Sequence, residues 1–75
     1  MKELVEFIAR SLVENPDAVR VKTRRSGSNL HVRVTASPED TGRLIGRRGR
    51  TAQAIRSVVK VAGMRRGLRV TVDID

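Results

Sequence analysis

Two glycines three positions apart, Gly46 and Gly49, enclose a pair of arginines, and this segment is the part of the sequence best suited to chemistry. Glycine lacks a Cβ, so it can adopt strained dihedral angles and lets another molecule approach the backbone closely. The residues after Gly49 have a helical pattern, and the free amides and positive dipole end of such a helix would face the loop. Arg47 and Arg48 add two full charges. These features favour phosphate in a linear backbone rather than in a deep nucleotide pocket.

Other phosphate-binding loops match this segment less well. A Walker loop has four residues between its glycines and then Lys-Ser/Thr, whereas Gly46 and Gly49 enclose two residues and Arg50-Thr51 follows. The dinucleotide fingerprint needs a glycine where Leu44 stands and a strand ahead of the loop. On spacing alone, the alternative to a phosphate-binding loop is a tight turn between two helices that needs glycine only for its backbone structure. It explains neither the two arginines nor the apolar residues that frame the turn.

The charge of the chain indicates a polyanionic partner. Sixteen Lys and Arg against eight Asp and Glu give a formal charge of +8 over 75 residues, which is the electrostatic footprint of a nucleic-acid-binding domain. An arginine-rich proteome or a surface charged for solubility is the alternative. Phe7 is the single aromatic residue, so the base-stacking platforms of RRM, cold-shock and OB-type proteins are excluded. Contacts must come from backbone amides, arginines and aliphatic side chains.

The sequence gives little support for catalysis. There is no cysteine, and His31 is the only histidine, so neither a metal-ligand set nor a nucleophile with its base is expected. Glu39-Asp40 is explained by helix capping, and Asp73 and Asp75 by an exposed carboxyl end. We therefore expect no catalytic residue, no metal and no cofactor. No apolar run has the length of a membrane span or signal segment, and the expected location is the cytoplasm.

The pattern of apolar residues predicts three helices and three strands. Period-two alternation indicates strands and wider spacing indicates amphipathic helices, while Asn15-Pro16 and Ser37-Pro38 are typical of a helix end and a helix start. Gly63 or Gly67 would end the last helix. The expected elements are a helix at 2–15, strands at 19–24 and 30–36, a short helix from Pro38, a helix at 50–64 and a strand at 68–75.

These elements are expected to form one α+β domain over residues 1–75. Each strand has one apolar face and each helix one apolar stripe, so the economical arrangement is a three-stranded sheet with all helices on one side, in the order α-β-β-α-α-β. Ser26-Gly27-Ser28-Asn29 would join the first two strands as a hairpin. The opposite sheet face would then be open and basic, with Arg20, Lys22, Arg24, His31, Arg33 and Arg69.

The frame around the glycine loop resembles the signature of the KH domain. That signature is a branched aliphatic pair, GxxG and apolar positions at three-residue steps, here Leu44-Ile45-Gly46-x-x-Gly49-x-x-Ala52-x-x-Ile55. The element order is similar to that of the type II KH domain. The whole chain further resembles the KhpA family of small bacterial single-KH RNA-binding proteins. That likeness runs from Leu4-Val5-Glu6-Phe7-Ile8 to Val70-Thr71-Val72-Asp73-Ile74, although this chain is richer in arginine and has Ala52 where many KH domains have isoleucine.

The resemblance implies non-catalytic binding of single-stranded RNA, with about four nucleotides held at the GxxG loop and an adjoining apolar groove. It also implies a homodimer, or a heterodimer with a larger KH-containing RNA-binding protein. The role would be that of a post-transcriptional regulator or RNA chaperone linked to cell elongation and cell shape. The RNA-binding residues that it implies are Ile45, Gly46, Arg47, Arg48, Gly49, Arg50, Ala52 and Ile55.

Two other binding functions remain open at this level. A protein-interaction module with a loop that no longer contacts RNA would be favoured by an acidic residue in the loop, whereas Arg47 and Arg48 oppose it. Binding of duplex DNA through the basic face is disfavoured, because the sequence has no long recognition helix with a basic exposed side. Single-stranded DNA stays possible beside RNA.

Overall fold

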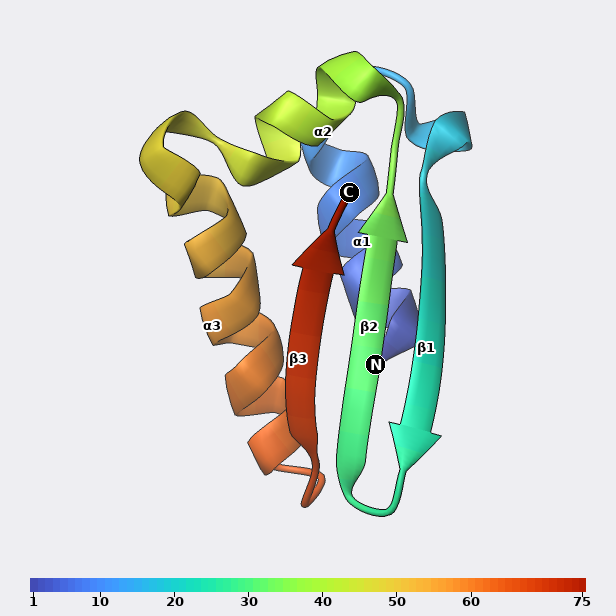
Figure 1. Cartoon of the computed structure of the whole chain (residues 1–75), viewed down its shortest axis with the longest axis vertical. Helices are drawn as coiled ribbons and strands as arrows, with labels where there is room; N and C mark the ends of the chain where they lie inside the picture. The colour runs from blue at the N-terminus through green and yellow to red at the C-terminus, as the bar shows by residue number, and fades with distance from the viewer.

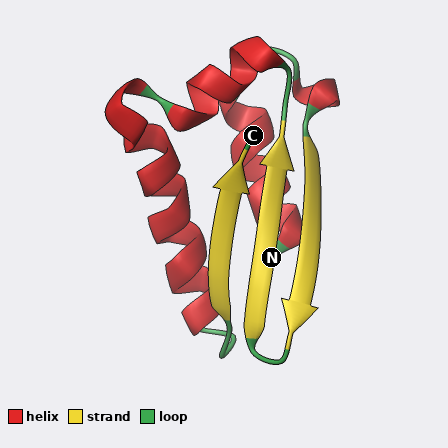
Figure 2. Cartoon of the chain, viewed as in Figure 1, coloured by secondary structure: helices red, strands yellow, loops and turns green.

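The chain folds into three helices and three strands, with two single-turn 3-10 segments between them. The computed structural model describes all 75 residues, and Figure 2 colours them by secondary structure. The bounds are α1 Lys2–Leu12, a 3-10 turn Pro16–Ala18, β1 Arg20–Ser26, β2 Asn29–Thr35, α2 Pro38–Ile45, a 3-10 turn Arg47–Gly49, α3 Arg50–Met64 and β3 Arg69–Ile74. The predicted order α-β-β-α-α-β is confirmed.

The strands form one sheet in the order β1-β2-β3, with β2 in the centre (Figure 1). The hairpin pairs β1 and β2 antiparallel, with Val21 opposite Val34. The second pairing, between β2 and β3, is parallel and places Leu30 beside Val70. A parallel connection requires a long crossover, and α2 and α3 provide it. The predicted hairpin and three-stranded sheet are therefore confirmed.

The core lies between one face of this sheet and the helices. In β2, alternate residues are fully buried because every second side chain points to the helical side. The other face has no helix over it, as Figure 1 shows with the strands in front and α1 behind them. The α+β prediction with helices on one face is confirmed. The core cluster consists of Val5, Ala9, Val19, Val21, Leu30, Val32, Val34, Leu44, Ile55, Val59 and Val72.

The first helix ends three residues earlier than the predicted range of 2–15. Val13 is already extended, with φ −106° and ψ 162°, and the backbone amides of Glu14 and Asn15 bond to the carboxylate of Asp40. A tertiary acceptor therefore takes the chain out of the helix before Asn15-Pro16 is reached. Along α1, Val5 and Ala9 are the buried positions, whereas Leu12 is exposed.

The other boundaries agree closely with the sequence patterns. The third helix spans Arg50–Met64 as predicted, with Gly63 buried inside its last turn. Of the two glycines proposed to end it, Gly67 has the left-handed conformation (φ 71°) typical of a residue after a helix. The first strand differs, because it spans Arg20–Ser26 rather than 19–24. The structure has no helix long and apolar enough to cross a membrane.

Candidate nucleic-acid interface

The loop predicted to contact phosphate lies between α2 and α3, and its position depends on how α2 is anchored. Ser37 precedes Pro38 at the start of α2, as predicted, but its hydroxyl makes no capping bond to the backbone. It donates instead to Asp40, 3.1 Å away. The carboxylate of Asp40 also accepts a bond from Arg43 at 2.9 Å. The first turn of α2 is thereby tied to the end of α1, which fixes the direction in which α2 runs toward the loop.

The carboxylate of Asp40 is held in its charged form. The pKa of Asp40 is lowered first of all by the backbone amide of Glu14; burial acts against this, and the amide of Asn15, the hydroxyl of Ser37 and the guanidinium of Arg43 lower it further. The side chain of Asp40 is almost fully covered, with 1% of the residue exposed. The sequence predicted only local helix capping here, so this network extends the prediction.

The GxxG loop has an unusual backbone. Gly46 has φ 75° and ψ 170°, and Gly49 has φ 73° and ψ 14°. Between them, Arg48 adopts φ 59° and ψ 25° and is the only non-glycine residue of the chain with positive φ. An L-residue there costs about 1–2 kcal/mol, and such strained positions cluster at functional sites. The amide of Gly49 bonds to the carbonyl of Gly46 at 3.1 Å, which closes the turn.

The two glycines of the loop are required for different reasons. A Cβ on Gly46 would overlap the side chain of Thr51, so this position needs both the absent side chain and the positive φ. A Cβ on Gly49 would meet nothing within 4 Å, so only its backbone conformation demands glycine. Gly49 also precedes α3 without any side-chain cap on that helix. The first amides of α3 consequently face the loop, as expected for an anion-binding turn.

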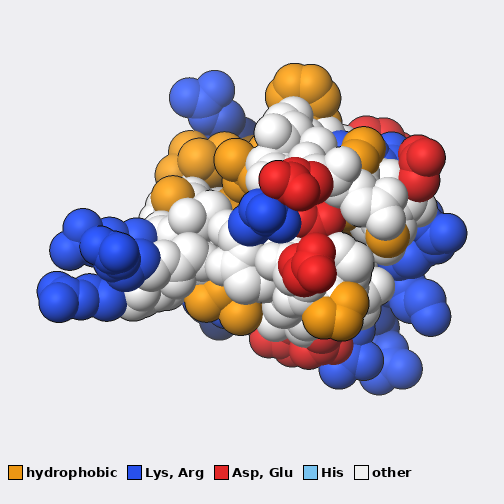
Figure 3. All heavy atoms as spheres, turned by 90° about the horizontal axis from the view of Figure 1, so that it is seen from above, with side chains coloured by type: hydrophobic (Ala, Val, Ile, Leu, Met, Phe, Trp, Pro, Cys, Tyr) orange, Lys and Arg blue, Asp and Glu red, His pale blue; other side chains and the backbone are white.

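The loop arginines are exposed and free of acidic partners. Arg47, Arg48 and Arg50 are exposed, and the ion pairs of the molecule all involve other residues. Viewed from above in Figure 3, blue Lys and Arg side chains project from the left, where Figure 1 places the turn between α2 and α3. The acidic side chains of that view lie away from this projection. The loop therefore presents uncompensated positive charge to solvent.

The predicted apolar residues divide into one exposed and two buried positions. Ile45 is 39% exposed at the end of α2, beside the loop. Ala52 and Ile55, in contrast, are 3% and 6% exposed on the inner face of α3. These two side chains support the loop from below and offer almost no surface. Open apolar surface near the loop must come from other residues.

A groove between α3 and the edge strand β3 supplies such a surface, and its lining residues lie outside the set that the resemblance implied. It has a volume of about 610 Å³ and combines apolar side chains with cations. The Nε of Arg56 donates to the carbonyl oxygen of Val72 at 3.1 Å and joins the two walls. The i, i+4, i+8 spacing of Arg56, Lys60 and Met64 is the signal that places them on one side of a helix. The lining residues are Arg56, Lys60, Met64, Leu68, Arg69, Val70, Thr71 and Val72.

A second groove, of about 440 Å³, lies between α1 and α3 and is mainly apolar. Ile8 and Leu12 contribute from α1, and Ala54 and Val58 from α3. Val58 is 54% exposed, and Leu12 on α1 is 44% exposed. Large exposed apolar side chains on one surface are typical of a protein contact.

The open face of the sheet is basic as predicted, but part of its charge is compensated. Nε2 of His31 lies 3.2 Å from Oδ2 of Asp73, and Nε of Arg33 lies 3.2 Å from Oδ2 of Asp75. The two aspartates are exposed at the carboxyl end, as expected, and their pairing with β2 adds to that expectation. The parallel register of β2 and β3 brings them to this face. No group of three or more His, Cys, Asp or Glu side chains could hold a metal ion.

Comparison with known proteins assigns the family. The sequence model of the KhpA/KhpB KH domain matches residues 2–74. Three relatives named RNA-binding protein KhpA are similar along their whole length. The one from Halalkalibacterium halodurans is 49% identical over 99% of this chain and 97% of its own. Those from Clostridium perfringens (46%; 99% of each chain) and Streptomyces coelicolor (47%; 100% of this chain, 95% of the relative) are nearly as similar. The chain belongs to the KhpA/KhpB family of KH domains.

Proposed function

We propose that residues 1–75 act as one KH domain that binds single-stranded RNA without catalysis. The observation that carries this proposal is the loop between α2 and α3, where exposed unpaired arginines surround a strained turn and an uncapped helix start. Relatives that share its sequence from end to end are named for RNA binding. The proposed contact residues are Ile45, Gly46, Arg47, Arg48, Gly49 and Arg50, with Ala52 and Ile55 supporting them from the core.

The groove between α3 and β3 is the surface on which we place the bases. Its apolar residues can cover the faces of bases, and Arg56, Lys60 and Arg69 can meet the phosphates between them. Without aromatic stacking, the preference for particular bases should be loose. The α1–α3 groove is a poorer candidate because Arg50 is the only cation that lines it.

A comparison of nucleic acids tests this proposal. We expect single-stranded RNA to bind more tightly than duplex RNA or duplex DNA of the same sequence, because only an unpaired strand can place its bases in the groove. Three to four phosphate contacts predict that log K falls with log salt at a slope of about −2 to −3. Equal or tighter binding of duplex DNA would support the alternative of duplex recognition by the basic face. Single-stranded DNA in the same series tests discrimination by the 2′-hydroxyl.

We further propose that the protein works as a homodimer through the α1–α3 groove. Apart from Arg50 at the start of α3, the exposed residues that line it are apolar on both helices. Ala54, Val58 and Val61 recur on one side of α3 at helical spacing. A second copy can cover this surface with the same surface of its own, as in twofold interfaces. One KH domain holds only about four nucleotides, so two linked loops would raise the affinity by avidity.

Substitution of Val58 tests the dimer. We expect Val58→Arg to convert a dimer into a monomer in sedimentation at micromolar concentration, because a charge would be buried in the apolar contact. Gln53→Arg is the matched control: Gln53 is exposed on the same helix and is rotated from Val58 by about 140°. A parent protein that sediments as a monomer at these concentrations would contradict the homodimer.

The biological role rests on the family rather than on the geometry. We propose a cytoplasmic post-transcriptional regulator or RNA chaperone, linked to cell elongation and cell shape. The same α1–α3 surface would allow pairing with a larger KH-containing RNA-binding protein in place of a second copy. Crosslinking to RNA in cells, with sequencing of the fragments and identification of co-purified proteins, would test the role and the partner together.

A further inference from the structure

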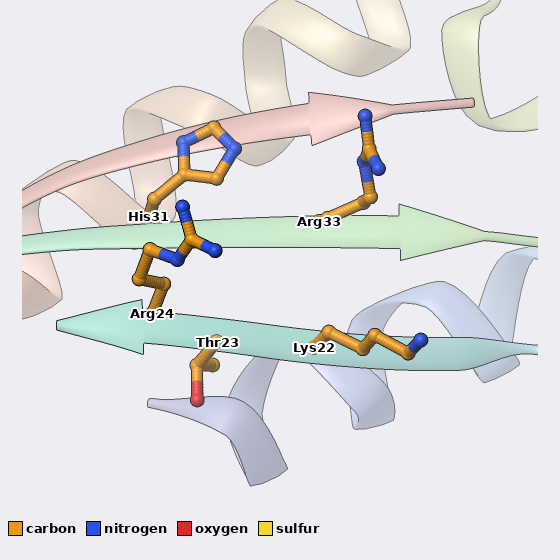
Figure 4. A pocket seen from close by; sticks show the side chains of 5 residues that line it. All are labelled: Lys22, Thr23, Arg24, His31 and Arg33. Carbon is orange, nitrogen blue, oxygen red and sulfur yellow. The ribbon is translucent and has the colours of Figure 1, made fainter.

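The open face of the sheet carries a basic hollow that the GxxG loop does not use. This hollow, of about 370 Å³, is lined by polar and charged residues alone. Figure 4 shows Lys22 and Arg24 on β1, with His31 and Arg33 on the neighbouring strand β2. All four are exposed, and no helix covers this side of the sheet (Figure 1).

The strand register places basic residues directly opposite one another. Lys22 is paired with Arg33 across the antiparallel ladder, and Arg24 is paired with His31. Opposed side chains have Cβ atoms about 4.5–5.5 Å apart, and like charges at that distance are destabilising. The Lys22–Arg33 pair is therefore electrostatically unfavourable in the free protein, where Asp75 offsets it only from the Arg33 side, and an anion bound over the hollow would relieve it.

The acidic residues on this face pair with basic side chains of β2 and leave those of β1 without an acidic partner. Asp73 and Asp75 pair with His31 and Arg33, as described above. In contrast, Lys22 and Arg24 make no ion pair and no side-chain hydrogen bond in the structure. Two unpaired cations two residues apart on one strand are separated by about 6.6 Å along it. This spacing suits successive phosphates of an extended strand.

The hollow is continuous with the groove proposed to hold the bases. Thr71 lines that groove, and its hydroxyl oxygen lies 2.8 Å from Nδ1 of His31, which lines the hollow. Arg69 is the first residue of β3. Asp73 lies near the end of that strand, opposite Arg33, and Asp75 directly follows the strand. A strand that leaves the groove can thus cross the sheet at Arg69 and Thr71, clear of Asp75, and it passes the carboxylate of Asp73 only where that group is already paired with His31.

We propose that the outer sheet face is a second phosphate-binding surface for the same single-stranded RNA, with Lys22 and Arg24 as its main contacts. The proposal rests on RNA binding at the loop and adds the path of the strand beyond it. An RNA of about four nucleotides fills only the loop and groove. A longer RNA continues past His31 to β1, so RNA length determines whether the sheet face contributes.

RNA length gives the test. We expect the Lys22→Thr, Arg24→Thr double variant to bind a 12-nucleotide RNA roughly 10-fold more weakly at 0.1 M salt, with a salt slope shallower by about 1.4, because two phosphate contacts are lost. Binding of a 4-nucleotide RNA should not change. Since both residues are exposed and face other cations, the melting temperature should be equal to that of the parent or higher.

Lys2→Ala with Arg25→Thr is the matched control. It removes two charges, and Arg25 adjoins Arg24 on β1 but belongs to the alternate set that points to the other side of the sheet. Equal losses in the control and in the test variant would indicate a general effect of net charge and overturn the proposal. A 12-nucleotide RNA whose affinity is unaffected by the test variant would also overturn it. If the parent bound neither RNA, the proposed function itself would be wrong, and this surface with it.

Discussion

An Arg47→Asp, Arg48→Asp double variant is expected to keep the fold and to bind single-stranded RNA about 100-fold more weakly at 0.1 M salt, because two attractive charges become repulsive at the closest approach of the phosphates. Both arginines are exposed and unpaired, so their loss removes no contact within the fold. Aspartate also tolerates the positive φ of Arg48 better than most residues do. The measurement is a titration of labelled RNA, with circular dichroism to verify the fold.

The control for this variant must reverse the same number of charges elsewhere. Lys2→Glu with Arg25→Glu does so near the hairpin end of the molecule, where Lys2 and Arg25 border a common hollow. We expect the control to weaken RNA binding by less than about 10-fold, through net charge alone. If the folded loop variant bound RNA as well as the parent, the GxxG loop would not be the binding site.

The second large effect is expected at Asp40, which holds the junction of α1 and α2. Asp40→Ala should lower the melting temperature by on the order of 10 °C, because it breaks a network around a buried carboxylate and leaves partly buried amide donors without an acceptor. The amides of Glu14 and Asn15 lose their partner, and Arg43 keeps only its 3.1 Å ion pair with Glu14. Glu39→Ala is the control, since Glu39 is exposed beside Asp40 in the same turn.

The same carboxylate makes stability depend on pH in a definite direction. The pKa of Asp40 is lower in the folded than in the unfolded chain, so its contribution is complete above the unfolded value of about 3.9. The contribution is lost as pH falls from that value through the folded pKa. Below about pH 4, we expect the melting temperature of the parent to decrease as the pH is lowered. The melting temperature of Asp40→Asn should decrease less steeply over the same range. Parallel curves for the two proteins would show that Asp40 is not the group responsible.

The elements of this fold were largely predictable because their signals are local. Alternation along β2 and the spacing of apolar residues in α3 each report which side of an element is buried, and both elements appear where predicted. The end of α1 was not predictable in this way. It is set by Asp40, which lies 26 residues after Glu14 in sequence, and no local pattern encodes an acceptor at that distance.

The candidate site was predictable in composition but not in shape. The sequence located the glycines and arginines of the loop, yet nothing local indicated that Arg48 would adopt positive φ. The apolar spacing of α3 did indicate that Ala52 and Ile55 would be buried, but not that Arg56 would reach the edge of β3. Those facts depend on how α3 is rotated against the sheet, which is a property of the tertiary packing.

The parallel pairing of β2 with β3 has a consequence for how the protein folds. The β1–β2 hairpin is local and can form within about 1–10 μs. His31 and Thr71 are 40 residues apart, so β3 can join only after a long chain closure, and such non-local pairing slows folding. Until then the cations of the hairpin face one another without Asp73 and Asp75. Dissolved salt or a polyanion can shield them during that interval, so the early steps of folding should be faster in salt even though the finished sheet pairs Arg33 with Asp75 and His31 with Asp73.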